Sequence, residues 1–234
     1  MKFIKFFDHL QRLINILFVN FFPYFTKNEF YQPSFTNNKK FFFINHTFKR
    51  DSDDRLDKIL MSINKSCKSY LDVGSQHGFF VFNLAKQNIF SFGIEADYAS
   101  YKYSKSLQFL CDLDNVNFIH KEVNFDYVKN LPNFDVVTFL SVFHHIVFFQ
   151  GKKNAINILK ELCHKTNKVF FFETGEYQEK GFYWTSSMSF LGNDTKSNMI
   201  SILQSFNCFK KIIVLGSHKN HLNSHRRLLF KCEK

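Results

Sequence analysis

The five cysteines include no C-x-x-C pair and are scattered along the chain, at Cys67, Cys111, Cys163, Cys208 and Cys232. Such spacing predicts neither a zinc site nor a disulfide framework, so we expect reduced thiols in a cytoplasmic protein and no bound metal. The sequence also lacks an uncharged apolar run of the ~18 residues that a membrane-spanning helix needs. A length of 234 residues suits one α/β domain with an appendage.

The charge balance is strongly positive, with a net charge of +11, and phenylalanine occurs 34 times. Phe, Lys, Asn and Ile all have A/T-rich codons, so genome composition explains part of both excesses. A positive surface also attracts phosphate-bearing acceptors, nucleic acid or an anionic membrane. The charge therefore agrees with several kinds of partner and selects none of them.

Residues 1–25 have the pattern of an amphipathic helix, and Pro23 should end it because proline cannot continue a helix interior. One face of the helical wheel is apolar: Phe3, Phe6, Phe7, Leu10, Leu13, Ile14, Leu17, Phe18 and Phe21. The other face is polar: Lys2, Lys5, Asp8, His9, Arg12 and Asn15. We expect residues 1–22 either to pack on protein or to lie peripherally in the inner membrane interface.

Residues 26–50 are polar and aromatic without a clear period, and we interpret them as a connector or lid. A helix then begins with Asp51 or Ser52 as its cap. Beyond it, apolar runs of strand length alternate with helical patterns. The expected strands are Tyr70–Val73, Phe90–Ile94, Val116–Ile119, Phe134–Leu140, Lys168–Phe172, Phe209–Leu215 and Arg227–Cys232. The expected helices cover residues 77–87, 98–111, 152–164 and 197–206.

Strands separated by helices of this length predict βαβ crossovers and a parallel sheet. Only the polar stretch 216–225 joins the last two strands, which predicts a hairpin. We therefore expect residues 51–234 to form an α/β, Rossmann-like domain. Its sheet should be seven-stranded and mostly parallel, with helices on both faces and a C-terminal antiparallel hairpin.

A turn with two glycines follows the first expected strand, in the run Asp72-Val73-Gly74-Ser75-Gln76-His77-Gly78. An open parallel sheet binds ligands beyond the carboxyl ends of its strands, where the strand order reverses. A dinucleotide site would have G-x-G-x-x-G, whereas this turn has G-x-x-x-G with Gln76 in the middle. An acid at the strand tip would also repel a pyrophosphate. The turn therefore disfavours NAD and FAD and favours a ligand with an amino group.

Two further acids follow strands of the same sheet. Glu95 ends the second expected strand about 20 residues after the turn, where a carboxylate accepts hydrogen bonds from ribose hydroxyls. Glu122 lies just past the third strand and could receive an adenine amino group, although an ordinary solvated turn explains it equally well. Together the acids indicate a nucleoside site.

The runs SYLDVGSQHGFF, FGIEAD and FDVVTFLSVFHHI resemble class I S-adenosylmethionine-dependent methyltransferases. More narrowly, LSVFHHIV at 140–147 and FYW at 182–184 resemble the methyltransferase domain of bacterial enzymes that terminate O-antigen chains by methylating a terminal sugar phosphate. The resemblance covers residues 29–190. Those enzymes also carry a kinase domain, which this chain is too short to hold.

The resemblance implies S-adenosylmethionine as the cofactor and assigns it a set of binding residues: Tyr31, Arg55, Asp72, Gly74, Ser75, Gln76, Gly78, Glu95, Ala96, Glu122 and Leu140. Arg55 has the chemistry to hold the methionine carboxylate in a bidentate pair. A helix-surface salt bridge to Asp51 or Asp54 is the alternative for this arginine.

The acceptor is expected at the end of the fourth strand, beside His144 and His145. A hydroxyl acceptor needs a base, for which a histidine is suited, whereas a phosphate is already anionic. Adjacent residues on a helical turn point apart, so one histidine should face the acceptor, and we favour His144. Glu173 ends the fifth strand and is a further catalytic candidate. Tyr183 and Trp184 could stack on a sugar or shield the sulfonium.

The leading hypothesis is a methyltransferase acting on a glycan or a small, optionally phosphorylated, acceptor in surface-polysaccharide biosynthesis. An RNA methyltransferase is an alternative, since basic residues cluster in the final hairpin at His218, Lys219, His221, His225, Arg226 and Arg227. A non-catalytic cofactor-binding subunit is another, because Gln76 replaces the usual middle glycine and might crowd the cofactor.

Overall fold

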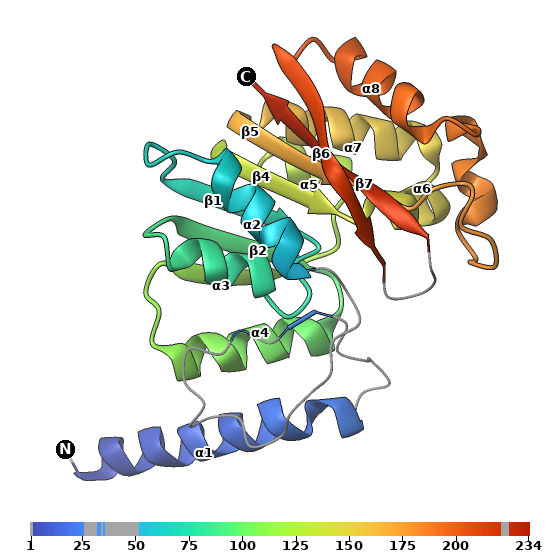
Figure 1. Cartoon of the computed structure of the whole chain (residues 1–234). Coiled ribbons are helices and arrows are strands. Elements are labelled where there is room, and N and C mark those ends of the chain that lie inside the picture. Colours follow the sequence, from blue (N-terminus) through green and yellow to red (C-terminus); the bar gives the residue numbers. More distant parts are fainter. Residues whose placement is uncertain (1, 26–31, 34, 36–51, 221–224) are drawn as a thin grey trace.

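A computed structural model describes residues 2–25, 32, 33, 35, 52–220 and 225–234 (Figure 1). The predicted lid, apart from three of its residues, and with it Tyr31, lies outside this part of the chain, as do Asp51 and His221.

Seven strands form one sheet in the order β3-β2-β1-β4-β5-β7-β6. Strands β1 to β5 are parallel, and β7 runs antiparallel to both β5 and β6. The strands are β1 Ser69–Val73, β2 Phe90–Glu95, β3 Val116–His120, β4 Phe134–Leu140, β5 Thr166–Glu173, β6 Lys211–Lys219 and β7 Arg226–Glu233. The strand order reverses between β1 and β4, so a ligand cleft is expected beyond the carboxyl ends of these two strands.

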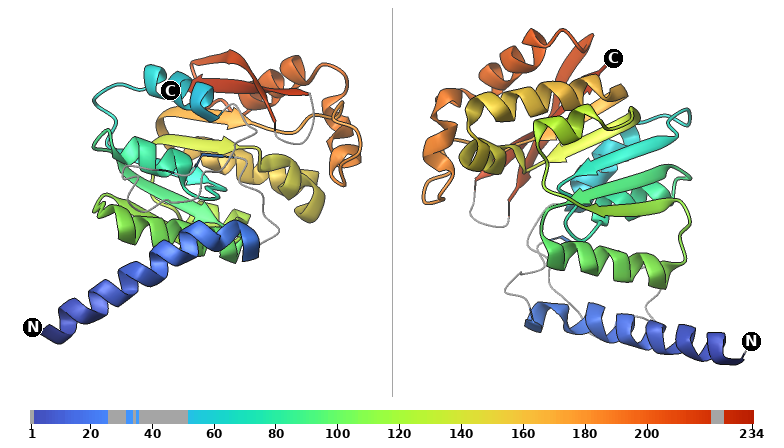
Figure 2. Two further views of the ribbon diagram at one scale, coloured as in Figure 1. Left: turned by 60° about the horizontal axis from the view of Figure 1, so that its bottom comes forward. Right: turned by 180° about the vertical axis from the view of Figure 1, so that it is seen from behind.

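The helices cover both faces of the sheet (Figures 1 and 2). They are α1 Lys2–Phe25, α2 Ser52–Ser62, α3 Phe79–Ala85, α4 Tyr98–Cys111, α5 Phe125–Lys129, α6 Phe143–Gln150, α7 Lys152–His164, the 3-10 helix η2 Thr185–Leu191 and α8 Thr195–Ser205. The predicted Rossmann-like fold class is confirmed. Helices α5 and η2 were not predicted, since five residues are too few to show a period and a 3-10 helix lacks the 3.6-residue repeat.

Two hydrophobic clusters line the two faces because successive strand residues point to opposite sides. Leu71 and Val73 of β1 belong to the cluster that includes α7, whereas Tyr70 belongs to the cluster that includes α3 and α4. Each face of the sheet is therefore sealed by helices. The polar residues of the candidate site therefore lie at the carboxyl ends of the strands.

Helix α1 lies on the outer side of α4, which separates it from the sheet in Figure 1 and in the right view of Figure 2. It runs through Pro23 to Phe25, so the prediction that Pro23 ends it is wrong by two residues. A proline this close to a helix end removes one hydrogen bond of the last turn, which the helix tolerates. No helix in the described ranges is long and apolar enough to cross a membrane.

Helix α1 contacts α4 through a narrow face that combines polar and apolar residues. Val19 and Phe22 are fully buried, Asn15 is buried beside them, and Arg12 forms an ion pair with Asp112 at 2.8 Å. The amides of Asn15 and Asn20 donate to the carbonyls of Gln11 and Ile16, each at 2.8 Å. The predicted packing on protein is therefore observed, but the strongly apolar face points outward.

His77 lies under this helix, at the turn that follows β1. Its ring is fully buried and contacts the rings of Phe22 in α1 and Tyr103 in α4, with centroid distances of 5.3 and 4.8 Å. Burial lowers the pKa of His77 to about 3. The imidazole is therefore neutral in the folded protein and links α1 to the turn.

This burial predicts an acid-sensitive fold. The unfolded chain binds a proton at His77 below pH ~6.5, whereas the folded chain does not until about pH 3. The contribution of His77 to the unfolding free energy is therefore fully present above pH ~6.5 and declines below it. The contribution of this residue is about 1.4 kcal/mol per pH unit between those values. We expect His77→Phe to reduce the slope of unfolding free energy against pH, measured by urea denaturation from pH 7 to 5. An unchanged slope in a variant that is folded at pH 7 would contradict this assignment.

Candidate active site

The turn after β1 is held against both neighbouring strands. The backbone nitrogens of Gly74 and Ser75 donate to the carbonyl of Ile94 in β2, at 2.8 and 3.0 Å. Gly74 has φ +80°, and a Cβ there would overlap Cγ2 of Val142, just after β4. Only glycine satisfies both constraints. The turn is thus fixed at the meeting point of β1, β2 and β4.

Gln76 occupies the left-handed region with φ +47°, which is strained for a residue with a side chain. Its nitrogen donates to Oε2 of Glu95 at 2.7 Å, and its carbonyl accepts from Oγ of Ser104 at 2.8 Å. Its side-chain oxygen Oε1 is buried and has no hydrogen-bond partner among the described residues. A buried acceptor in a strained turn marks a place where a ligand is expected.

Ser75, also predicted to bind the cofactor, directs its side chain the other way. Its Oγ would lie 2.5 Å from a Cβ placed on Gly93, so the hydroxyl faces β2. Only the backbone of Ser75 is therefore available at the ligand side of the turn. Gly78 caps α3 with φ +80°, and a Cβ there would lie 2.6 Å from the ring of Phe118.

Glu95 bridges two backbone segments at the end of β2. Its Oε2 accepts from the nitrogen of Gln76 and its Oε1 from the nitrogen of Asp97, at 2.7 and 2.8 Å. Burial raises the pKa of Glu95 above its ordinary value. A carboxylate has about four acceptor sites, so this bridging still leaves capacity for two hydroxyls of a ribose. Ala96 follows Glu95 and is exposed.

Asp72 is buried at the tip of β1. Its Oδ1 accepts from Oγ1 of Thr138 in β4 at 2.7 Å, and that hydroxyl in turn lies 2.6 Å from Oη of Tyr70. Burial, together with the charge of Asp72, raises the pKa of Tyr70, which keeps the phenol protonated. The chain thus fixes an acid between the two strands at the switch point. Leu140 is buried at the end of β4.

Glu122 is exposed beyond β3 and lies 3.3 Å from the amide nitrogen of Gln150 in α6. No buried group of the site contacts it in the described hydrogen bonds. The structure therefore places it at the rim, on the same edge as Glu95 but away from the turn.

Arg55 and Glu173 form a buried ion pair across the domain. Nε of Arg55, in α2, lies 2.7 Å from Oε2 of Glu173, and the side chains are 1% and 0% exposed. Nη2 of Arg55 also donates to the carbonyl of Lys219 in β6 at 3.1 Å. The alternative salt bridge to Asp54 is not formed, because Asp54 pairs with Lys58 instead. The arginine therefore joins α2 to β5 and β6.

The same pair fixes Glu173, which was also predicted to be catalytic. Its second oxygen, Oε1, accepts from Oγ of Ser141 at 2.5 Å, and its backbone carbonyl accepts from the nitrogen of Ser141 at 2.7 Å. A fully buried carboxylate that is ion-paired and hydrogen-bonded holds its neighbours in place. These contacts favour a positioning role for Glu173, and its catalytic role stays a prediction.

His144 and His145 begin α6 and point apart, as expected. His144 is buried, its Nδ1 accepts from the nitrogen of Gly175 at 2.8 Å, and its ring lies 4.3 Å from that of Trp184. An Nδ1 that accepts a backbone hydrogen bond leaves the proton on Nε2, so this ring is neutral. The preference for His144 as the acceptor-facing residue stays a prediction, and the structure shows its ring enclosed.

His145 is the partly exposed member of the pair. Its Nδ1 lies 2.7 Å from Oη of Tyr183, which is itself exposed. Burial, with the positive charge of Arg227, lowers the pKa of His145 to about 4, so the ring is unprotonated at neutral pH. Trp184 is buried against His144, and of the two predicted aromatic residues only Tyr183 is accessible to a substrate.

A second buried charge cluster lies beyond the histidines and was missed from the sequence. Arg227 of β7 makes a bidentate pair with Glu179 at 2.7 and 2.8 Å, and Asn220 donates to the same carboxylate at 3.1 Å. His225 lies 3.2 Å from Glu176, whose pKa is raised by burial. The three-residue spacing of Glu173, Glu176 and Glu179 was the available signal.

These contacts also bear on RNA binding. Arg227 and His218 of the basic cluster in the final hairpin are buried, and Arg226 is hydrogen-bonded to Ser217 at 3.1 Å. Nucleic-acid sites expose such side chains to phosphates. Two of the five described members of the cluster are thus internal, while Lys219 and Arg226 are exposed, so the basic surface that would support RNA binding is reduced. No group of three or more metal-ligating side chains occurs among the described residues, and all five cysteines are free thiols.

No family model matches the sequence, and no curated protein matches it. Among solved structures, the chain is similar to the bifunctional kinase-methyltransferase WbdD, at 22% identity and a TM-score of 0.72, over 88% of this chain and 44% of WbdD. It thus spans less than half the length of WbdD.

The chain is also similar to the N-terminal domain of EvdMO1. The structure of that domain with SAH bound matches at 13% identity and a TM-score of 0.57, over 78% of this chain and 81% of the domain. A structure in the presence of SAH and D-fucose matches at 13% identity and a TM-score of 0.61, over 88% and 91%. The fold is therefore the one that the methyltransferase resemblance implied.

The buried ion pair yields a stability prediction. Arg55→Met leaves the Glu173 charge buried without its partner, which should lower the unfolding free energy by about 3–5 kcal/mol in urea titrations. Adding Glu173→Gln should recover part of this loss, because the uncharged amide keeps a donor and an acceptor. Lys58→Met, which breaks the exposed pair with Asp54, is the matched control and should cost less than about 1 kcal/mol. Equal costs for Arg55→Met and Lys58→Met would contradict the assignment.

Proposed function

We propose that this protein is an S-adenosylmethionine-dependent methyltransferase that acts on a glycan or a small sugar-containing acceptor, phosphorylated or not. The observation that carries the proposal is the bridge of Glu95 between the strained turn residue Gln76 and Asp97. The carboxylate of Glu95 lies directly beside the turn, where it would accept hydrogen bonds from the ribose of the cofactor. The folds of WbdD and EvdMO1 agree with it.

The residues present fit the cofactor. The two acids Asp72 and Glu95 flank the turn, an arrangement that suits an amino group and a ribose and disfavours a pyrophosphate. The buried, unpartnered Oε1 of Gln76 provides an additional acceptor. The backbone of Gln76 cannot rotate freely, because its nitrogen donates to Glu95 and its carbonyl accepts from Ser104.

S-adenosylmethionine, when bound, supplies an electrophilic methyl group on a sulfonium. The chain has to position an acceptor in line with that methyl group and, for a hydroxyl acceptor, to take up its proton. His145 is neutral, partly exposed and fixed by Tyr183, so it can accept that proton. We also propose Arg55 as a ligand of the methionine carboxylate, because a guanidinium can hold a carboxylate in a bidentate pair.

The acceptor class is supported by charge. At the acceptor end, Arg227 pairs with Glu179, so this buried guanidinium already has a carboxylate. The described residues there favour a sugar hydroxyl over a phosphate for this reason. D-fucose accompanied SAH in one EvdMO1 structure, which agrees with a sugar acceptor. We further propose a cytoplasmic role in surface-polysaccharide biosynthesis.

The cofactor assignment predicts the effect of Glu95→Ala. Loss of the carboxylate removes both the ribose acceptor and the anchor of Gln76, so S-adenosylmethionine should bind at least about tenfold more weakly by calorimetry. Glu161→Ala, on the surface of α7, is the matched control and should bind as the wild type does. Unchanged affinity in a folded Glu95→Ala protein would refute the proposed site.

The acceptor assignment predicts different effects on two acceptor chemistries. With a sugar-hydroxyl acceptor, His145→Gln should lower kcat by about 10²-fold or more, while cofactor affinity stays the same. With a sugar-phosphate acceptor, which needs no base, the loss should be small. Because the pKa of His145 is about 4, the wild-type rate should be level at neutral pH and fall only as the pH approaches 4. Full hydroxyl methylation by His145→Gln would exclude this residue as the base.

A further inference from the structure

Helix α1 carries a continuous apolar surface that nothing in the described part of the chain covers. Its members are large, exposed and spaced at helical intervals; we call them the outer stripe: Phe7, Leu10, Leu13, Ile14, Leu17 and Phe21. Phe7 is 61% exposed and Leu17 is 53% exposed. The stripe runs along a helix of 24 residues, which is about 36 Å long.

The orientation of α1 is inverted relative to that of an ordinary surface helix. A soluble domain usually buries the apolar stripe of a helix and exposes the polar side. Here Arg12 pairs with Asp112 of α4, and the amides of Asn15 and Asn20 donate to carbonyls of their own helix. These three polar side chains of α1 therefore have hydrogen-bond partners within the protein. The outer stripe can contact an apolar environment without burying them there unpaired.

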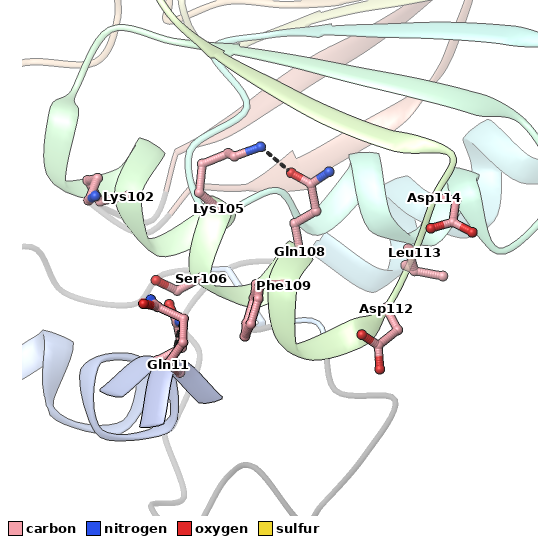
Figure 3. Close-up of a pocket in the computed structure, with 10 residues that line it drawn as sticks. Gln11, Lys102, Lys105, Ser106, Gln108, Phe109, Asp112, Leu113 and Asp114 are labelled. Atoms are coloured by element: carbon pink, nitrogen blue, oxygen red, sulfur yellow. Dashed lines mark hydrogen bonds between the residues drawn. The ribbon is translucent and has the colours of Figure 1, made fainter. Parts of the chain in front are cut away.

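Positive charges border the outer stripe. Gln11 lies one turn after Phe7 and lines an open crevice of about 570 Å³ between α1 and α4, which also contains Lys102 and Lys105 (Figure 3). Lys102 is exposed, and Lys105 lies 2.6 Å from Oε1 of Gln108. Asp112, which pairs with Arg12, and Asp114 line the same crevice, so it carries both signs of charge, and Lys102 is its exposed cation.

The opposite flank is basic in sequence. Lys2, Lys5 and His9 fall together on the helical wheel next to the stripe. Asp8 is the one acid in the sequence of α1, and it falls on the side of the wheel away from the stripe. Together with a net charge of +11, this pattern complements an anionic surface.

We propose that the outer stripe of α1 lies in the interface of an anionic membrane, which holds the protein peripherally at the lipid surface. A basic amphipathic helix with large aliphatic and aromatic residues has the composition of an interfacial helix. The stripe exposes on the order of 500 Å², below the ~800 Å² per partner of a standard protein interface, so lipid is a better occupant than a second copy.

The proposal is tested by co-sedimentation of the full chain with phosphatidylcholine vesicles that contain phosphatidylglycerol. Wild-type protein should bind these vesicles, bind pure phosphatidylcholine vesicles weakly, and lose binding as salt increases. Leu13→Gln/Leu17→Gln should weaken partitioning by at least about tenfold. Lys102→Gln/Lys105→Gln should weaken it by about fivefold for each lysine, on the anionic vesicles alone.

Two controls separate this outcome from misfolding and from failure of the proposed enzyme function. Met61→Gln/Phe90→Gln removes two exposed apolar residues outside α1 and should leave vesicle binding unchanged. All variants should bind S-adenosylmethionine as the wild type does, since the outer stripe is remote from Glu95. Vesicle binding that survives Leu13→Gln/Leu17→Gln would overturn the proposal. So would a wild-type dimer that this variant converts to a monomer, with no vesicle binding by either.

Discussion

The ion pair between Arg55 and Glu173 connects the parts of the molecule that have to act together. It joins α2, which precedes the sheet, to the carboxyl end of β5 and, through the carbonyl of Lys219, to β6. Through Ser141 it also fixes the segment after β4. A buried pair of this kind adds little net stability compared with an apolar pair, but it strongly penalises any arrangement in which one partner is missing. Its main effect is therefore to specify a single geometry around the cleft.

Charge pairing governs the acceptor end as well. Glu179 neutralises Arg227, and that arginine still lowers the pKa of His145. The histidine is thereby kept neutral, while Tyr183 limits the rotation of its ring. The arrangement favours an acceptor whose own charge is small. The sequence resemblance, in contrast, pointed to a phosphorylated sugar.

The sheet could be predicted from the sequence because apolar runs and helical periods alternate strictly from Tyr70 to Cys232. The cofactor end was predictable for a related reason: Asp72, the glycines and Glu95 are near in sequence, and the strand order brings them together. The acceptor end was not, since burial decides it. His144 and His145 are neighbours, and only the packing of Trp184 against Gly175 shows which one is enclosed. Glu173 and Arg55 are 118 residues apart, beyond the reach of any local pattern.

The contact between Gly74 and Val142 constrains how this sequence can drift. A methyl group at position 74 meets Cγ2 of Val142, and the left-handed backbone disfavours it independently. A smaller side chain at position 142 would relieve the overlap but not the backbone strain at position 74. Exchanging either residue alone is therefore expected to lower stability. Position 142 lies inside the LSVFHHIV run, next to the histidines. Substitutions in the turn after β1 and in the LSVFHHIV run are thus expected to co-vary among homologues.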